Sequence, residues 1–351
     1  MTNPFSNTLS ELGEFGLISR IAAEVSPVEG VITGIGDDAA VTALTPDMQL
    51  LTSTDMLLEG VHFRLDWHDP WRLGRKSLAV SISDLAAMGA RPRWALLSIA
   101  IPADCPLDFL DQFTHGFLDI ASQYGITLIG GDTCKSKSGL ILSVTIMGEQ
   151  LPEHIVMRSG ARPDDDIWVS GTLGDAALGL ELLQASVPAP SLQKGEIHNN
   201  DDYEAAQQQV MARLLDPVPR VCAGRALAEA GLVTAMIDIS DGLVADFGHI
   251  TEQSKVGGII RLEALPISNA FRTATQNRPA FPYHLVLAGG EDYELAFTAS
   301  PANREKIHHL MNKCGVGALP VGIVTSRPGV TVLWPDGSHY TPEVSGFTHF
   351  S

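Results

Sequence analysis

The chain has 351 residues, of which 45% are hydrophobic and 18% charged, so it is long enough for two domains and too apolar to be intrinsically disordered. Its formal net charge of −18 argues against a nucleic-acid partner, because phosphate backbones attract Lys and Arg. An acidic protein can still bind an anionic nucleotide when cations lie between the two.

The cysteines Cys105, Cys134, Cys222 and Cys314 lie far apart in the sequence. Their spacing predicts neither a zinc site nor a disulfide framework and favours reduced thiols. The first residues lack the basic and apolar regions of a secretory signal, and no apolar stretch approaches the ~18 residues of a membrane helix. We therefore expect a cytoplasmic protein with no membrane partner.

Strand-like and helix-like segments alternate along the first half, which predicts α/β architecture. Asp69 and Pro70 are typical of a helix start, and Gly125 of a helix end. The expected strands are 50–55, 94–101, 126–129 and 140–147, and the expected helices are 70–88 and 106–124.

A domain boundary near residues 150–160 predicts one domain over 1–150 and a second over 151–351. The second half repeats the alternation, and both halves contain a Gly-Gly-acid sequence, a weak indication that they are related. Residues 185–203 are polar and proline-bearing, which predicts an irregular surface excursion. The expected strands are 166–170, 233–239 and 284–287, and the expected helices are 175–183, 241–253 and 304–313.

Acidic residues gather at predicted strand ends and glycine turns. These segments are Gly34–Asp38, Ser53–Asp55, Gly130–Thr133, Asp238–Gly242 and Gly289–Asp292. Because ligands bind at the carboxyl ends of strands in α/β sheets, we expect the acids to converge on one cleft. Clustered carboxylates repel one another, and Mg²⁺ is the oxygen-seeking cation that relieves this repulsion. Each segment taken alone fits an ordinary turn or helix cap equally well.

Asp84 belongs to a polar stripe on an otherwise apolar predicted helix, together with Ser77 and Ser81. A carboxylate on a buried helix face needs a partner. A metal ion fits, and so does a buried Arg or a helix cap.

The segment Ser170–Asp175 contains two glycines between a predicted strand and helix, which fits either a phosphate contact or a plain helix entry. The chain has no Walker A sequence, no G-x-G-x-x-G after a strand and no protein-kinase catalytic loop. His62 lines the expected cleft or is merely structural, and Cys134 has no neighbouring base.

Together these motifs resemble the thiamine-monophosphate kinase family, within the aminoimidazole-ribonucleotide synthetase-like superfamily. The matching segments are Gly13–Phe15, Gly34–Ala40, Ser53–Asp55, Gly60–Phe63, Ser83–Ala90, Gly130–Thr133, Arg158–Ala161, Asp238–Leu243, Gly289–Leu295 and Gly346–Phe350. The resemblance implies a two-domain α/β fold whose N-terminal domains pair in a homodimer through a shared β-barrel. It also implies transfer of phosphate from ATP to thiamine monophosphate with several Mg²⁺ ions.

The resemblance assigns roles by position. Mg²⁺ ligands would be Asp38, Ser53, Thr54, Asp55, Asp84, Asp132, Asp238 and Asp241; ATP contacts would be Gly131, Asp132, Arg158 and Ser240; thiamine-phosphate contacts would be His62, Glu291 and Phe347. No residue is expected to form a covalent intermediate, because the acceptor is an ionised phosphate and direct in-line transfer suffices.

Two alternatives stay open. A sister ATP-dependent synthetase shares the fold, but the reactive N-terminal cysteine of selenophosphate synthetase and the cysteine-bearing tail of the hydrogenase-maturation relative have no counterpart here. A non-catalytic acidic protein that binds metal or nucleotide is the second alternative, and it would not need the full set of acids.

Overall fold

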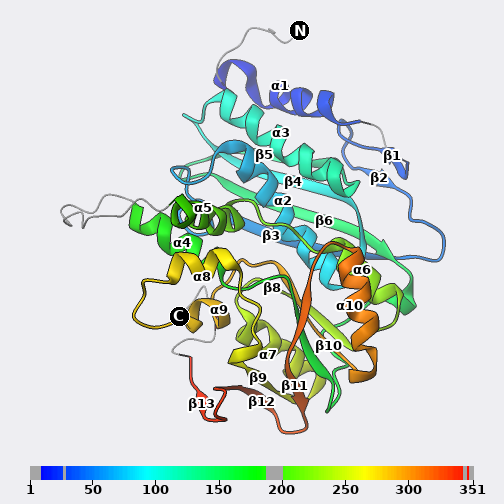
Figure 1. Ribbon diagram of the computed structural model, residues 1–351. Coiled ribbons are helices and arrows are strands. Elements are labelled where there is room, and N and C mark those ends of the chain that lie inside the picture. The colour runs from blue at the N-terminus through cyan, green and yellow to red at the C-terminus, as the bar shows by residue number, and fades with distance from the viewer. Residues whose placement is uncertain (1–8, 27–28, 187–200, 343–345, 348–351) are drawn as a thin grey trace, which may run out of the picture. The chain divides into compact units, whose positions relative to one another are not determined.

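A computed structural model describes residues 9–26, 29–186, 201–342 and 346–347. The chain divides into two compact units (Figure 1). The N-terminal unit comprises Met1–Leu85 and Ala90–Glu153, and the C-terminal unit comprises Ala86–Gly89 and His154–Ser351.

The N-terminal unit is built on a four-stranded sheet in the order β3-β6-β4-β5. β6 runs antiparallel to both of its neighbours, and β4 and β5 are parallel. A separate pair, β1 and β2, is antiparallel. The elements are α1 (Leu9–Glu24), β1 (Val31–Thr33), β2 (Val41–Thr42), β3 (Gln49–Leu58), α2 (Pro70–Ala87), β4 (Arg91–Pro102), α3 (Leu107–Tyr124), β5 (Thr127–Ser136) and β6 (Ile141–Gln150).

Local signals fix the helices of this unit. The backbone N–H of Arg72 donates to Asp69 Oδ1 at 2.9 Å, so Asp69 caps α2 as predicted. Gly125 ends α3 in a left-handed conformation with φ of 66°. Along β6, Leu142, Val144 and Ile146 are fully buried and alternate with partly buried residues, as expected for a strand with one covered face.

The C-terminal unit is built on a seven-stranded sheet in the order β13-β12-β9-β11-β7-β10-β8. β10 lies between β7 and β8 and runs antiparallel to both, so β7 and β8 point the same way. The strands are β7 (Asp166–Ser170), β8 (Ala235–Ile239), β9 (Gly257–Arg261), β10 (Glu294–Ala299), β11 (Ala318–Thr325), β12 (Gly329–Leu333) and β13 (His339–Tyr340). The helices are α4 (Asp175–Ser186), α5 (Asp201–Leu215), α6 (Val221–Glu229), α7 (Leu243–Ser254), α8 (Asn269–Thr275), α9 (Tyr283–Leu287) and α10 (Arg304–Lys313).

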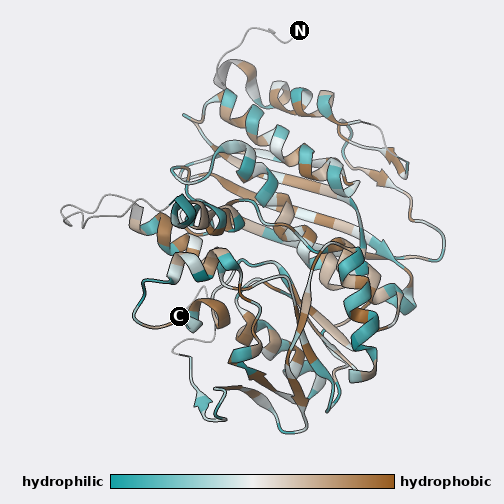
Figure 2. Ribbon diagram, in the orientation of Figure 1, coloured by the Kyte–Doolittle hydropathy of each residue, from teal (hydrophilic) through white to brown (hydrophobic). Residues whose placement is uncertain are grey.

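Hydrophobic layers cover both faces of this sheet. One layer joins alternate strand residues such as Ile167 and Ile237 to α4, α5, α7, α8 and α9. The other joins the intervening residues, among them Trp168 and Phe297, to α6 and α10. Figure 2 shows apolar residues along these strands and polar residues on the outer turns of α5 and α10. Because both faces are covered, polar groups of the strands reach ligands only at the ends of the sheet.

Several local predictions are wrong. Residues 284–287 belong to α9 rather than to a strand. Ser53–Asp55 lies in the middle of β3, Gly130–Asp132 lies inside β5, and Gly289–Asp292 precedes β10 instead of following a strand. The excursion predicted over 185–203 is helical at both described ends, because α4 extends to Ser186 and α5 begins at Asp201; residues 187–200 lie outside the described residues.

The cysteines also differ from the prediction of reduced thiols. Cys222 in α6 and Cys314 at the end of α10 form a disulfide with Cα atoms 5.6 Å apart, and Cys105 and Cys134 are free. The partners are 92 residues apart, so no local spacing signals the bond. Among the described residues, no helix combines the length and apolarity needed to cross a membrane.

Candidate active site

Two carboxylates of the N-terminal unit, Asp55 and Asp84, form a pair supported by serine hydroxyls. Ser81 on α2 donates to Asp55 Oδ2 at 2.7 Å, and Ser53 on β3 donates to Asp84 Oδ2. Both acids are partly buried, and Ser81 is fully buried. The predicted polar stripe of α2 thus holds at Ser81 and Asp84, whereas Ser77 donates to the Gly74 carbonyl of its own helix. We name Asp55 and Asp84 the carboxylate pair.

Burial, and then the nearby charge of Asp84, raise the pKa of Asp55 from 3.8 to about 6, although the Ser81 hydroxyl favours the ionised form. Two partly buried acids that repel each other in this way suit a cation. Serine and carboxylate oxygens are hard ligands of the kind that Mg²⁺ prefers, so the donor set fits that ion.

A second predicted group lines a hollow of about 980 Å³ in the same unit. Its walls include Asp38, Gly131 and Asp132, together with Ser98 of β4 and Thr145 of β6. Asp38 and Asp132 are both exposed. Of the predicted ligands, these two acids therefore share one space.

The chain segment that carries Asp38 is fixed at both ends by a buried ion pair between Arg93 and Glu149. Arg93 donates to the Glu29 carbonyl at 3.1 Å on one side of the segment. On the other side, Thr45 donates to Glu149 through its backbone N–H at 3.1 Å and its hydroxyl at 2.8 Å. The Arg93 and Glu149 side chains are 10% and 0% exposed, so the ion pair is shielded from water.

The carboxylate pair and Asp132 lie toward opposite edges of the sheet. Asp55 is paired with Val144, Val144 with Leu97, and Leu97 with Gly131. Three strand spacings of about 4.8 Å separate Asp55 from Gly131 by roughly 14 Å. The sheet of a single chain therefore does not bring Asp55 and Asp132 to one cation.

The three consecutive predicted ligands of β3 are divided between its two faces. Ser53 and Asp55 face α2, whereas the exposed Thr54 contacts the Thr145 hydroxyl at 3.1 Å and donates to the Val144 carbonyl at 3.1 Å. His62 follows β3, and its Nδ1 accepts from the Leu58 backbone N–H at 3.0 Å. This bond gives His62 a structural role at the strand end.

In the C-terminal unit, the predicted residues other than Arg158 lie at one end of the sheet, where several strand ends meet. β7 and β8 end there and β10 begins there, because β10 is antiparallel to both. The Gly-Gly-Glu-Asp segment therefore lies at the same end of the sheet as Asp238–Gly242, although it precedes its strand. Asp238 is a buried residue of β8, while Ser240 and Asp241 follow the strand and are partly buried.

Asp246 anchors the turn that carries Ser240 and Asp241. Its Oδ2 accepts the backbone N–H groups of Ser240, Asp241 and Gly242, each at 3.0 Å. Burial raises the pKa of Asp246 to about 6, while these three donors favour its ionised form. The sequence reading missed this residue because an acid in the first turn of a helix is common.

Glu291 and Phe347 both lie against this turn. The Glu291 N–H donates to the Ser240 carbonyl at 2.8 Å, and the Phe347 N–H donates to the Asp241 carbonyl at 3.0 Å. Gly290 permits the approach, because a Cβ there would lie 2.3 Å from the Ser240 oxygen. The Phe347 side chain is 51% exposed and can offer its ring to a ligand.

Arg158 lies at the other end of β8. Ser254 donates to its carbonyl at 3.4 Å, and the carbonyl of the preceding Met157 accepts from Met236 at the start of the strand. The structure thus groups Ser240, Asp241, Glu291 and Phe347, and it places the backbone of Arg158 away from them within this unit.

The glycine turn 171–174 faces carboxylates. The Gly174 N–H donates to both oxygens of Asp292, at 2.9 and 3.2 Å, and a Cβ at Gly171 would lie 2.0 Å from a Glu294 oxygen. This geometry favours the helix-entry interpretation over phosphate contact. In the described part of the chain, no three His, Cys, Asp or Glu side chains gather closely enough to hold one metal ion between them. The predicted convergence of all the acids is therefore not present within either unit.

Comparison with known proteins defines the class to which this fold and site belong. The model of the AIR synthase related protein N-terminal domain matches residues 36–150, and that of the C-terminal domain matches residues 162–335. The chain is therefore an AIR synthase related protein with the two-domain α/β fold expected from its sequence.

Individual relatives narrow this assignment. The chain is 37% identical to a thiamine-monophosphate kinase of Escherichia coli over 340 residues, which cover 97% of this chain and 98% of the relative. A crystal structure of thiamine-monophosphate kinase from Stenotrophomonas maltophilia has a TM-score of 0.80 and 38% identity, covering 93% of this chain and 98% of that one. A structure of AaThiL complexed with AMPPCP and TMP has a TM-score of 0.73 and 34% identity, covering 99% and 100%. The chain belongs to the thiamine-monophosphate kinase family.

Proposed function

We propose that the protein transfers the terminal phosphoryl group of ATP to thiamine monophosphate, giving thiamine diphosphate and ADP. Membership of the kinase family supports this reaction, as does the relative that binds AMPPCP and TMP together. The observation in this chain that carries the proposal is the carboxylate pair, Asp55 and Asp84, held by Ser81 and Ser53.

Asp55 and Asp84 would hold Mg²⁺ together with phosphate oxygens of the nucleotide. Mg²⁺ is usually bound by one or two protein carboxylates and completed by phosphates and water, so a full protein cage is not needed. When bound, the ions supply positive charge that reduces the repulsion between two anionic reactants. Asp38, Thr54, Asp132, Asp238 and Asp241 stay proposed ligands of further ions.

The remaining roles rest on the resemblance of the sequence motifs to the kinase family. Gly131, Asp132, Arg158 and Ser240 are the proposed ATP contacts, and Arg158 would add a fixed positive charge to the phosphates. Glu291 and Phe347 would contact the thiamine part, Phe347 by stacking its exposed ring on a thiamine ring. His62 is the third proposed contact to this substrate. No protein nucleophile is needed, because the acceptor oxygen is already ionised and catalysis consists of positioning and charge neutralisation.

A homodimer is part of the proposal, and the two edges of the N-terminal sheet support it. Asp55 lies on the β3 edge and Asp132 on the β5 edge. If two copies close their sheets into one barrel, the β3 edge of one protomer meets the β5 edge of its partner. Leu50 and Met56, both exposed on β3, would be covered by such pairing.

The cytoplasm is the proposed location, because an ATP-dependent kinase needs a supply of ATP. Cytoplasmic thiols are kept reduced, so the Cys222–Cys314 disulfide would be in exchange with its dithiol form there.

The direct test is to measure ADP release with thiamine monophosphate, free thiamine and aminoimidazole precursors as acceptors. We expect ADP and thiamine diphosphate to form in equal amounts only when thiamine monophosphate is the acceptor. Their formation should require Mg²⁺. Equal rates with free thiamine, or ADP release without thiamine diphosphate, would contradict the proposed reaction.

A further inference from the structure

The segment Glu291–Glu294 has an alternating construction. Glu291 and Tyr293 have φ of 66° and 49°, in the left-handed region that residues other than glycine rarely occupy. Their backbone N–H groups donate to the Ser240 and Ile239 carbonyls at 2.8 and 2.9 Å. Strained backbone of this kind persists only where surrounding contacts determine it.

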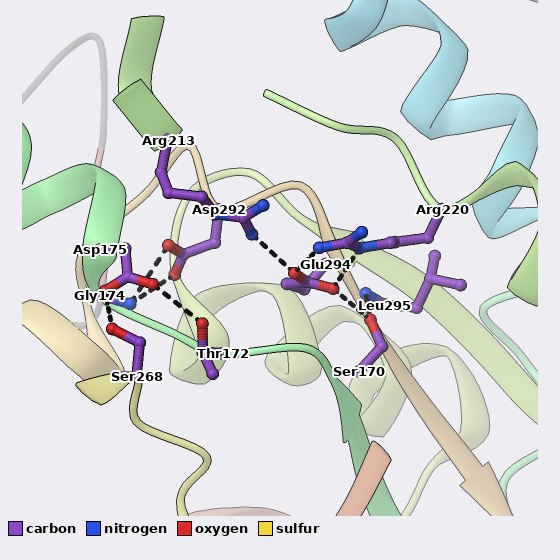
Figure 3. A network of polar contacts seen from close by, with 10 residues as sticks. All are labelled: Ser170, Thr172, Gly174, Asp175, Arg213, Arg220, Ser268, Asp292, Glu294 and Leu295. Carbon is purple, nitrogen blue, oxygen red and sulfur yellow. Dashed lines mark hydrogen bonds and ion pairs between the residues drawn. The ribbon is translucent and has the colours of Figure 1, made fainter. Parts of the chain in front are cut away.

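Asp292, which lies between the two strained residues, and Glu294, which follows them, provide those contacts (Figure 3). Both are buried, with 4% and 0% of their surface exposed. The Asp292 carboxylate accepts the Gly174 N–H, and burial raises its pKa well above the ordinary value.

Glu294 is tied to three further residues of the unit. It accepts from Ser170 Oγ at 2.6 Å, from Arg213 of α5 at 2.7 Å and from Arg220 Nε at 2.7 Å. Ser170 Oγ in turn accepts from the Leu295 backbone N–H at 2.8 Å. In Figure 3, Glu294 lies between the two guanidinium groups, and Asp292 lies beside Gly174 and Asp175.

Stability alone is a weak reason for this arrangement. A buried ion pair loses the hydration of both charges, and well-packed apolar residues often replace it without loss. Here the two buried acids alternate with two strained residues, and one of the strained residues is Glu291, which contacts the turn carrying Ser240.

We propose that Asp292 and Glu294 are positioning residues for thiamine monophosphate. By fixing the backbone on either side of Tyr293, they hold Glu291 in the left-handed conformation that directs its carboxylate toward the substrate. This inference rests on the proposed function, and specifically on Glu291 as a contact to the thiamine part.

The test compares shape-conserving variants of buried acids near the two ends of β7. Asp292→Asn and Glu294→Gln change the positioning residues, and Asp166→Asn is the matched control. Asp166 is a buried carboxylate 3% exposed that pairs with Arg304 at 2.6 Å, and it begins the strand that Ser170 ends. Arg213→Gln removes a Glu294 partner that is itself 22% exposed, and it serves if Glu294→Gln does not fold.

We expect Asp292→Asn and Glu294→Gln to raise KM for thiamine monophosphate roughly tenfold and to leave KM for ATP within about twofold. Asp166→Asn should lower Tm without changing either constant. If both positioning variants change the two KM values equally, or behave like Asp166→Asn, the inference is wrong.

Measurements on the wild type and on Glu291→Gln distinguish a failure of the positioning inference from a failure of the proposed function. A wild-type protein that makes no thiamine diphosphate refutes the proposed function. A wild type that makes it, with a Glu291→Gln variant of unchanged KM for thiamine monophosphate, refutes the Glu291 contact and the positioning inference that depends on it, and leaves the proposed reaction standing.

Discussion

Asp55→Asn should stabilise the metal-free protein while abolishing its activity. In the folded protein, burial and then the charge of Asp84 raise the pKa of Asp55 from 3.8 to about 6. Each pKa unit corresponds to about 1.36 kcal/mol, so the ionised Asp55 destabilises the folded protein by at most about 3 kcal/mol. Because part of the Asp55 side chain reaches water, we expect the substitution to raise the free energy of unfolding of the metal-free protein by about 1–2 kcal/mol. Asparagine keeps an oxygen that can accept the hydrogen bond from the Ser81 hydroxyl, and it carries no charge.

The sign of the pH dependence follows from proton binding. An acid whose pKa is raised by folding binds its proton more tightly in the folded state. Its contribution to stability is therefore fully present below about pH 4 and is lost as the pH rises to about 6. In the metal-free protein, the variant and wild type should match near pH 4, and the variant should be more stable at pH 7.

Urea unfolding in EDTA at pH 4.5, 6 and 7.5, repeated with saturating Mg²⁺, measures this difference. We expect Mg²⁺ with an ATP analogue to stabilise the wild type and to stabilise the variant much less. Turnover of the variant should fall to less than about a tenth of the wild-type rate, a loss of at least roughly 1.4 kcal/mol. A variant that is less stable than the wild type in EDTA at pH 7.5, or a difference that does not change with pH, would refute the reasoning.

Three further changes test other parts of the structure. Asp246→Ala should lower the free energy of unfolding by about 2–4 kcal/mol in urea titrations, because three N–H groups lose their acceptor; Asp246→Asn keeps an oxygen and should lower it less. Cys314→Ser should lower it by about 2–4 kcal/mol under oxidising conditions, because the disulfide closes a long loop, and dithiothreitol should remove the difference from wild type. Phe347→Ala should raise KM for thiamine monophosphate about three- to tenfold and leave KM for ATP unchanged in initial-rate assays; equal changes would reject the stacking role.

Sequence patterns predicted the features whose signals are local. Asp69 before Pro70 marks the start of α2, and the spacing of Ser81 and Asp84 along that helix predicted a polar face on it. The family motifs predicted the two-domain fold across most of the chain. These features needed no knowledge of which strand lies beside which.

The positions of the glycine-acid motifs could not be read in the same way. Gly130 and Gly131 suggested a turn because glycine is common there, yet they lie within β5. The short apolar run 284–287 fits a strand or a helix equally well, and it forms α9. No sequence motif singles out Arg213 or Arg220, and only the fold shows that Glu294 lies between them.

The net charge of −18 has a different meaning in the light of the structure. Glu149, Asp246 and Asp292 each accept backbone N–H groups inside the protein and thereby fix a glycine-containing segment. These acids are part of the framework, so only a fraction of the acidic excess is available to cations. Asp55 differs from them because it accepts a hydrogen bond from the Ser81 hydroxyl and its charged neighbour is another carboxylate, Asp84. Substituting the framework acids should therefore change stability under all conditions, whereas substituting Asp55 should change it in opposite directions with and without Mg²⁺.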